Sequence, residues 1–333
     1  MKRNLALALT ASILPFAALA GFRAAPVADY DPEKPLSLGV SANFTALAGE
    51  AREHVFSPKA EALSYSKETG APYSRRRHQL SRLDWDMDSV TLVGLTGSAR
   101  AGRLSFNLGG WFGCGTVDDA DMNDYDWMYG DHVGWSDYSH SESELTEAWM
   151  LDANVSYDFY RDGGNAGYAF VGIRAQRWEW TADGLNDYCY AENGHVWSHD
   201  VAHVCDYRQE LAFGYLGLGG TWALDDRFSL SAYASWAPAY MGSDHDNHIA
   251  VEKDFEGDFD YDDGNVYGAG VEISYLLDKG VSLTLALDWQ KATLHEGDLS
   301  LWDYGEGEGE EADDSAGFEN EYVALTLGIN ITF

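Results

Sequence analysis

The chain has few cysteines, few prolines and few basic residues. It contains three Cys, seven Pro and 21 Lys and Arg against 55 Asp and Glu, for a formal charge of −34. This charge excludes a nucleic-acid-binding protein, because phosphate contacts need a cationic surface. A large acidic excess attracts cationic partners over long distances, although acidic loops that only keep the chain soluble give the same composition.

Long apolar runs are also missing, apart from one at the N-terminus. Residues 1–20 combine a basic start, an apolar stretch and a small-x-small cleavage site at Ala18-Leu19-Ala20. They predict a secretory signal peptide, followed by a single domain over 21–333. Because no later run is long enough for a transmembrane helix, the sequence predicts an exported protein that is not a helical membrane protein.

Glycine and aromatic residues are abundant, with 35 Gly, 20 Tyr and 12 Trp. This composition is typical of outer-membrane β-barrels, and soluble exported enzymes share it. Apolar side chains alternate with period two in many segments, most clearly toward the terminal Phe333. The predicted strands cover residues 36–48, 80–98, 103–115, 145–161, 167–182, 207–224, 228–243, 260–277, 281–296 and 319–333.

Ten strands are an even number, which closes an antiparallel barrel with no free edge in lipid. The connections alternate between short turns and long segments, and the long ones lie near 49–79, 116–144, 183–206, 244–259 and 297–318. The predicted fold is therefore all-β: a ten-stranded antiparallel transmembrane β-barrel with long extracellular loops and short periplasmic turns. Several tryptophans fit either interfacial girdles or core packing: Trp85, Trp111, Trp149, Trp178, Trp180, Trp236 and Trp289.

Two short strings carry the chemistry. Asp124 and Asp126 are two residues apart, and so are Asp246 and His248. On a strand, residues two apart point to the same face, so these four groups can face a shared cleft and activate a water molecule. Crowding of three carboxylates predicts a raised pKa for at least one of them. An Asp-rich turn or a metal site is the alternative for each string alone.

The chain resembles the omptins, a family of outer-membrane endopeptidases with ten-stranded barrels. The resemblance spans most of the chain and is carried by Gly49-Glu50-Ala51-Arg52-Glu53, Leu83-Asp84-Trp85, Asp124-Tyr125-Asp126-Trp127-Met128, Trp135-Ser136-Asp137, Ser243-Asp244-His245-Asp246-Asn247-His248 and Phe333. It implies that Asp124 and Asp126 hold a nucleophilic water. It also implies that His248 is the general base and that Asp246 orients its imidazole, as in hydrolytic triads.

The same resemblance implies the substrate class. Glu53 and Asp244 match an acidic pocket for an Arg or Lys side chain before the scissile bond, and Asp137 matches a position that binds the following residue. Cleavage at dibasic sites in cationic peptides or proteins is therefore expected. The resemblance predicts no metal and no cofactor, apart from lipopolysaccharide as a candidate requirement for activity.

The lipopolysaccharide site matches the family pattern only in part. Arg177 falls on one basic position, whereas Ile173, Ala175 and Glu210 stand at neighbouring positions where the pattern differs. Outer-membrane lipid is still the expected surroundings, with the active site facing the cell exterior. A catalytically idle barrel that acts as an adhesin or structural protein is the main alternative, and a side-chain-filled lumen argues against a third option, a solute channel.

Two features lie outside the family pattern. Arg75-Arg76-Arg77, in a long predicted loop, is a candidate self-cleavage sequence for an enzyme of this specificity. Cys189 and Cys205 fall in one predicted loop region, where an exported protein can form a disulfide, which would leave Cys114 unpaired.

Overall fold

The computed structural model describes residues 36–57, 64–65, 72–73, 78–88, 90–114, 117–127, 135–190, 196–197 and 203–333. The predicted signal peptide and Arg75-Arg76-Arg77 lie outside these ranges. No helix within them is long and apolar enough to span a membrane.

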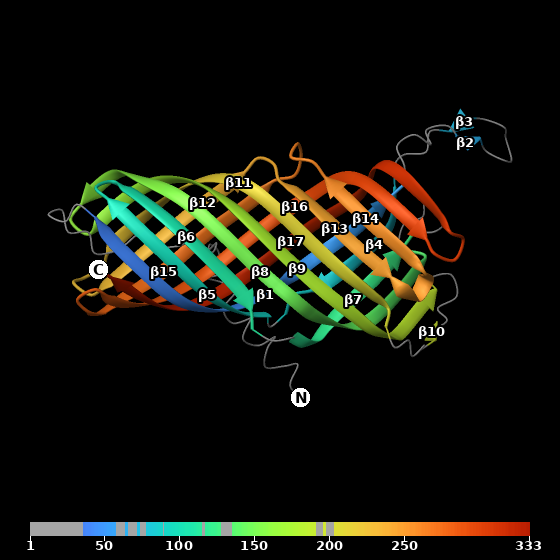
Figure 1. Ribbon diagram of the computed structural model, residues 1–333, viewed down its shortest axis with the longest axis horizontal. Coiled ribbons are helices and arrows are strands. Elements are labelled where there is room, and N and C mark those ends of the chain that lie inside the picture. Colours follow the sequence, from blue (N-terminus) through green and yellow to red (C-terminus); the bar gives the residue numbers. More distant parts are fainter. Residues whose placement is uncertain are drawn as a thin grey trace.

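The strands form one closed antiparallel ring of ten passes (Figure 1). The passes are β1 (Ser37–Phe56), β4 (Gln79–Asp86) with β5 (Val90–Ala101), β6 (Leu104–Gly113) with β7 (Val117–Asp126), β8 (Asp137–Asp162), β9 (Asn165–Tyr190), β11 (Cys205–Ala223), β12 (Phe228–Ala237) with β13 (Met241–His248), β14 (Lys253–Phe259) with β15 (Val266–Asp278), β16 (Val281–Asp303) and β17 (Glu308–Thr332). Pairing of β1 with β17 closes the ring. The remaining elements are short: β2 (Ser64–Tyr65), β3 (Pro72–Tyr73), β10 (Val196–Trp197) and the 3₁₀ turn η1 (Ile249–Val251).

The half of the barrel that ends in short turns has an apolar outside and a polar inside. Large apolar side chains face outward there; Leu95 and Ile173, for example, are 67% and 66% exposed. On the lumen side, Arg174 donates to Asp152 at 2.9 Å and to Gln290 at 3.0 Å. An outward apolar band with polar residues inside is the pattern of a barrel in lipid, and the paired groups fill the lumen with side chains.

The short turns follow the prediction, and in three of them a glycine makes the turn possible. Gly102, Gly163 and Gly280 have φ angles of +59°, +57° and +77°, values that L side chains rarely adopt. At Gly280 an added Cβ would also lie 2.6 Å from the carbonyl oxygen of Thr332.

In the segments predicted as long loops, most of the described residues continue the strands. In the segment 297–318, β16 and β17 pair as far as Asp303 and Glu308 and are joined by a tight turn. In the segment 244–259, β13 and β14 are strands joined by η1. Beyond the lipid, the outward face needs no apolar residues, so the alternation that marks a lipid-facing strand is lost while the backbone ladder continues.

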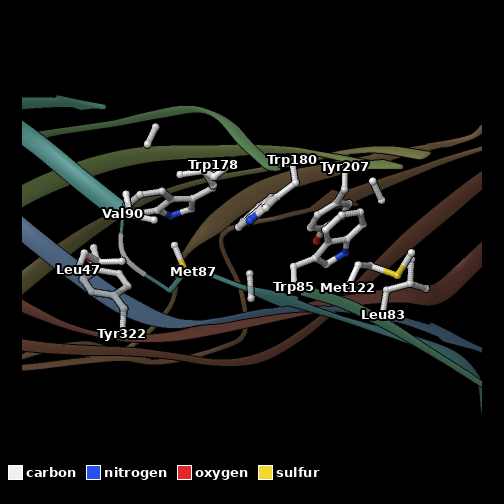
Figure 2. Close-up of a cluster of buried hydrophobic side chains, with 14 of the residues drawn as sticks. Leu47, Leu83, Trp85, Met87, Val90, Met122, Trp178, Trp180, Tyr207 and Tyr322 are labelled. Carbon is white, nitrogen blue, oxygen red and sulfur yellow. The ribbon is translucent and has the colours of Figure 1, made fainter. Parts of the chain in front are cut away.

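The barrel half that carries β4, β7, β13 and β14 lies at the end opposite β5, β6, β12 and β15 (Figure 1). Between the two halves, a cluster of buried aromatic side chains crosses the lumen (Figure 2). Trp85, Trp178 and Trp180 belong to it and are fully buried, as is Tyr207 at 1% exposure. For these tryptophans the core-packing alternative is confirmed, and the girdle interpretation is wrong.

The proposed disulfide is also wrong. Cys205 is buried and free, and Cys114 is exposed and free. Cys205 pairs with Ala182 on β9, whereas Cys189 lies seven residues further along that strand. Seven strand residues span about 23 Å, whereas the Cα atoms of a disulfide lie within about 7 Å.

Candidate active site

The first predicted pair lies on β7. Ala120 and Met122 are buried on the lumen face, and strand alternation places Asp124 and Asp126 on the same face, closer to the rim. Asp126 stands opposite Asp137 of β8. The Ser81 hydroxyl, from β4, donates to Asp124 Oδ1 at 3.3 Å.

The second pair lies on β13. Asp244 and Asp246 are 4% and 2% exposed, and His248 follows on the same face. His248 Nδ1 lies 3.3 Å from Asp246 Oδ2. The other oxygen of Asp246 is buried and has no hydrogen-bond partner among the described residues. The contact leaves His248 Nε2 as the nitrogen that can act on a water or a substrate.

Ring closure makes the two pairs one site. β7 and β13 are not neighbours in the ring, yet the charges of Asp124, Asp126 and Asp246 all act on His248. Burial raises the pKa of Asp124 to about 8, and the nearby Asp126 adds to this effect while His248 opposes it. Burial likewise raises the pKa of Asp126.

The same charges determine the protonation of His248. Burial alone lowers the pKa of the imidazole, but the contact with Asp246 and the charges of Asp124 and Asp126 outweigh it and raise the pKa to about 9. An imidazole that must accept a proton is ready only when neutral. The free site therefore favours base chemistry at alkaline pH, or with a cation bound nearby.

Two buried acids adjoin the pairs, at the position of the predicted acidic pocket. Glu53 of β1 and Asp244 are each 4% exposed. Burial, together with the charges of Asp246, Asp244 and Asp124, raises the pKa of Glu53 well above its usual value. Burial raises the pKa of Asp244 to about 7. Within the described part of the chain, Glu53 Oε2 has no hydrogen-bond partner, so a bound cation would satisfy both charge and hydrogen bonding.

Asp137 is close to the first pair rather than to the Glu53 pocket. Its side chain is 6% exposed and its charge acts on Asp126. The Ser136 hydroxyl donates to Asp137 Oδ2 at 2.8 Å. Two acidic positions thus lie apart along the site, one at the pocket and one at the Asp124–Asp126 pair.

Arg177 lies on the outer wall, where three glutamates surround its guanidinium. The nitrogens of Arg177 lie 2.5 Å from Glu179, 3.3 Å from Glu210 and 3.5 Å from Glu147. Glu210 stands where the omptin pattern has a basic residue. Its carboxylate pairs with Arg177, the arginine that does match the pattern.

Sequence reasoning missed Ser81 and Tyr207. Ser81 contacts Asp124, and the Tyr207 hydroxyl donates to Asp244 Oδ2 at 3.3 Å. Ser81 lies two residues before the Leu83-Asp84-Trp85 string, and Tyr207 lies outside every quoted string, so only the strand register could connect them with Asp124 and Asp244. Across the described ranges, no group of three or more His, Cys, Asp or Glu residues is arranged to hold a metal ion.

The fold and the site together define a class: an outer-membrane β-barrel with a group of buried acids and a histidine inside one end. The Omptin family model matches residues 34–333. Protease 7 of Escherichia coli O157:H7 is 25% identical over 95% of this chain and 96% of its own length. The plasminogen activator of Yersinia pestis is 25% identical over 84% and 87%.

A solved structure agrees on the fold. The crystal structure of the outer membrane protease OmpT from Escherichia coli matches with a TM-score of 0.79 and 21% identity, covering 92% of this chain and all of that one. The chain belongs to the omptin family. The predicted family, the barrel fold and the assignment as an outer-membrane protease are thereby confirmed.

Proposed function

We propose that this protein hydrolyses peptide bonds after basic residues, at dibasic sites, with a water activated between Asp124/Asp126 and Asp246/His248. The observation that carries the proposal is the meeting of these two pairs in one lumen beside a buried acidic pocket. Neither pair alone would distinguish catalysis from a polar loop.

The reaction follows from the geometry of the pairs. His248, held through Nδ1 by Asp246, takes a proton from the water as its oxygen attacks the scissile carbonyl carbon. Asp124 and Asp126 hold the water, and a carboxyl with a raised pKa at Asp124 stays protonated near neutrality and can donate to the developing oxyanion. The imidazolium then returns the proton to the leaving amine, which breaks the peptide bond.

Specificity follows from the buried acids. A guanidinium or ammonium group in the pocket would pair with Glu53 and Asp244, whose pKa values are raised in its absence, chiefly by burial and also by the charge of Asp246. Asp137, near Asp126, would receive a second basic side chain on the other side of the scissile bond. Bound cations would also lower the pKa of His248, because they offset the negative charge around it.

The site would face the cell exterior, because it lies at the end opposite the short turns of the barrel (Figure 1). The side chains inside the lumen argue against a channel. Arg174 and Asp152 pair within it, and the buried aromatic cluster of Trp85, Trp178 and Trp180 crosses it between the two halves of the barrel. Lipopolysaccharide is the proposed lipid partner. A direct phosphate contact at Arg177 would have to displace its three glutamate partners.

The test is cleavage of a fluorogenic Arg-Arg peptide by the purified barrel in detergent, with and without lipopolysaccharide. The wild type should cut after the first Arg and ignore the matched peptide with citrulline, an uncharged analogue of Arg. His248→Ala and Asp124→Ala should abolish cutting. Absence of wild-type cleavage under both lipid conditions would reject the proposal, and adhesion that persists in both variants would favour the idle barrel.

A further inference from the structure

The carboxylate of Asp244 is held from two strands. Its Oδ2 accepts a hydrogen bond from the Tyr207 hydroxyl on β11 at 3.3 Å, and it also accepts from the backbone N–H of Gly257 on β14. A Cβ at Gly257 would lie 2.2 Å from Asp244 Oδ1. Only glycine therefore lets the carboxylate approach the β14 backbone this closely.

Tyr207 is itself the last member of a hydrogen-bonded chain across the lumen. Asn320 Nδ2, from β17, donates to Gln209 Oε1 at 2.7 Å. Gln209 Nε2 donates to the Tyr207 oxygen at 3.2 Å. These three side chains are at most 2% exposed, so water does not compete for the bonds. Because the phenol oxygen accepts from Gln209, its one proton is directed to Asp244.

The ring of Tyr207 is fixed by packing as well. It stacks on Trp85 with a centroid distance of 5.2 Å and an interplanar angle of 10° (Figure 2), and it contacts Trp180 at 5.6 Å. Both tryptophans are fully buried. The hydroxyl therefore has little freedom to leave Asp244, in contrast to a donor on a surface side chain.

We propose that Tyr207 is a positioning residue for substrate recognition. The chain from Asn320 through Gln209 to Tyr207 holds Asp244 as an oriented, ionised wall of the pocket. Glu53, whose Oε2 has no hydrogen-bond partner among the described residues, is then the carboxylate left for the cationic side chain of the substrate. This inference rests on the proposed function, because it concerns the pocket for the basic residue before the scissile bond.

The groups that face Asp244 explain why it needs this support. Asp246 on the same strand and Glu53 on β1 carry like charges, and Tyr240 also faces it. Burial and Asp246 raise the pKa of Asp244, whereas the Tyr207 and Gly257 bonds lower it. Removal of the Tyr207 hydroxyl raises this pKa further, so the carboxylate ionises only at higher pH.

The experiment uses Tyr207→Phe in the full-length protein, assayed across the neutral and alkaline range with the Arg and citrulline peptides. We expect KM for the Arg peptide to rise about tenfold near neutral pH, with kcat nearly unchanged. The difference should shrink as pH rises and Asp244 ionises. The matched control is Tyr322→Phe, which removes an equally buried hydroxyl that donates to Gln176 Oε1 at 3.2 Å; it should not change the Arg/citrulline discrimination.

Gly257→Ala tests the same carboxylate from its other side and should also raise KM for the Arg peptide. If the wild type cleaves after Arg while Tyr207→Phe keeps both its KM and its pH dependence, the positioning role is wrong and the proposed function stands. If the wild type cleaves after no basic residue, the proposed function itself fails. If Tyr207→Phe does not fold, an unchanged KM in folded Gly257→Ala overturns the positioning role.

Discussion

Asp246→Asn tests the link between His248 and the pH dependence of catalysis. The variant keeps the shape of a residue that is 2% exposed but removes the charge 3.3 Å from His248 Nδ1. A hydrogen bond to a charged group is worth about 1.5–3 kcal/mol, and one pKa unit corresponds to about 1.4 kcal/mol. The pKa of His248, about 9 in the intact site, should therefore fall by about 1–2 units.

The sign of the effect is set by the base role. His248 must be neutral to accept a proton, so kcat/KM should rise with pH through its pKa, and Asp246→Asn should move this rise to lower pH. The maximal kcat should fall by about 10³–10⁴-fold, because an asparagine can hold the imidazole in the wrong tautomer. The wild-type kcat profile should also rise at lower pH than its kcat/KM profile, since a bound substrate cation offsets the surrounding carboxylates.

The assay is a pH series with the Arg-Arg peptide, with the exposed Asp258→Asn on β14 as the matched control. The control should keep both the rate and the profile of the wild type. If kcat/KM rises with the same apparent pKa in Asp246→Asn and in the wild type, the reasoning is refuted. It is also refuted if Asp246→Asn keeps the full kcat of the wild type.

Three further variants test the structure. Glu53→Gln should cost about 2 kcal/mol or more in kcat/KM for the Arg peptide, as expected when one member of a buried charge pair is removed, and the citrulline peptide should remain uncut. Burial raises the pKa of Glu53, so ionisation of this carboxyl destabilises the folded protein as pH rises toward and through that pKa. At alkaline pH, Glu53→Gln should therefore unfold at a higher temperature than the wild type. Equal unfolding temperatures would contradict this. Trp85→Ala removes a fully buried ring and should destabilise the barrel by about 3–5 kcal/mol, measured by denaturant titration against the half-exposed Trp302→Ala. Gly280→Ala meets a backbone oxygen at φ +77°, and a loss of about 1–3 kcal/mol is expected, whereas Gly97→Ala, which meets nothing within 4 Å, serves as its control.

The lipid-facing half of the barrel was predictable because lipid imposes a pattern. A strand with lipid on one side and a polar lumen on the other must alternate, and Phe44 outside with Thr45 inside is one example. The half beyond the lipid was not predictable in this way. β14 carries three acids on one face, Asp254, Glu256 and Asp258, and the start of β17 carries acids on both faces, so these strands have the composition of loops.

Sequence by itself determined the chemistry that was available. Spacing of two residues put Asp124 with Asp126 and Asp246 with His248 on common faces, because alternation is a property of any strand. Only the tertiary structure decided that the two faces meet, because β7 and β13 are joined through ring closure and not through a shared ladder. It also decided which acids are supported. Tyr207 on β11 contacts Asp244 on the neighbouring β13 through the register of these two strands. Asn320 on β17 reaches Gln209 on β11 across the lumen, a contact that depends on the barrel diameter.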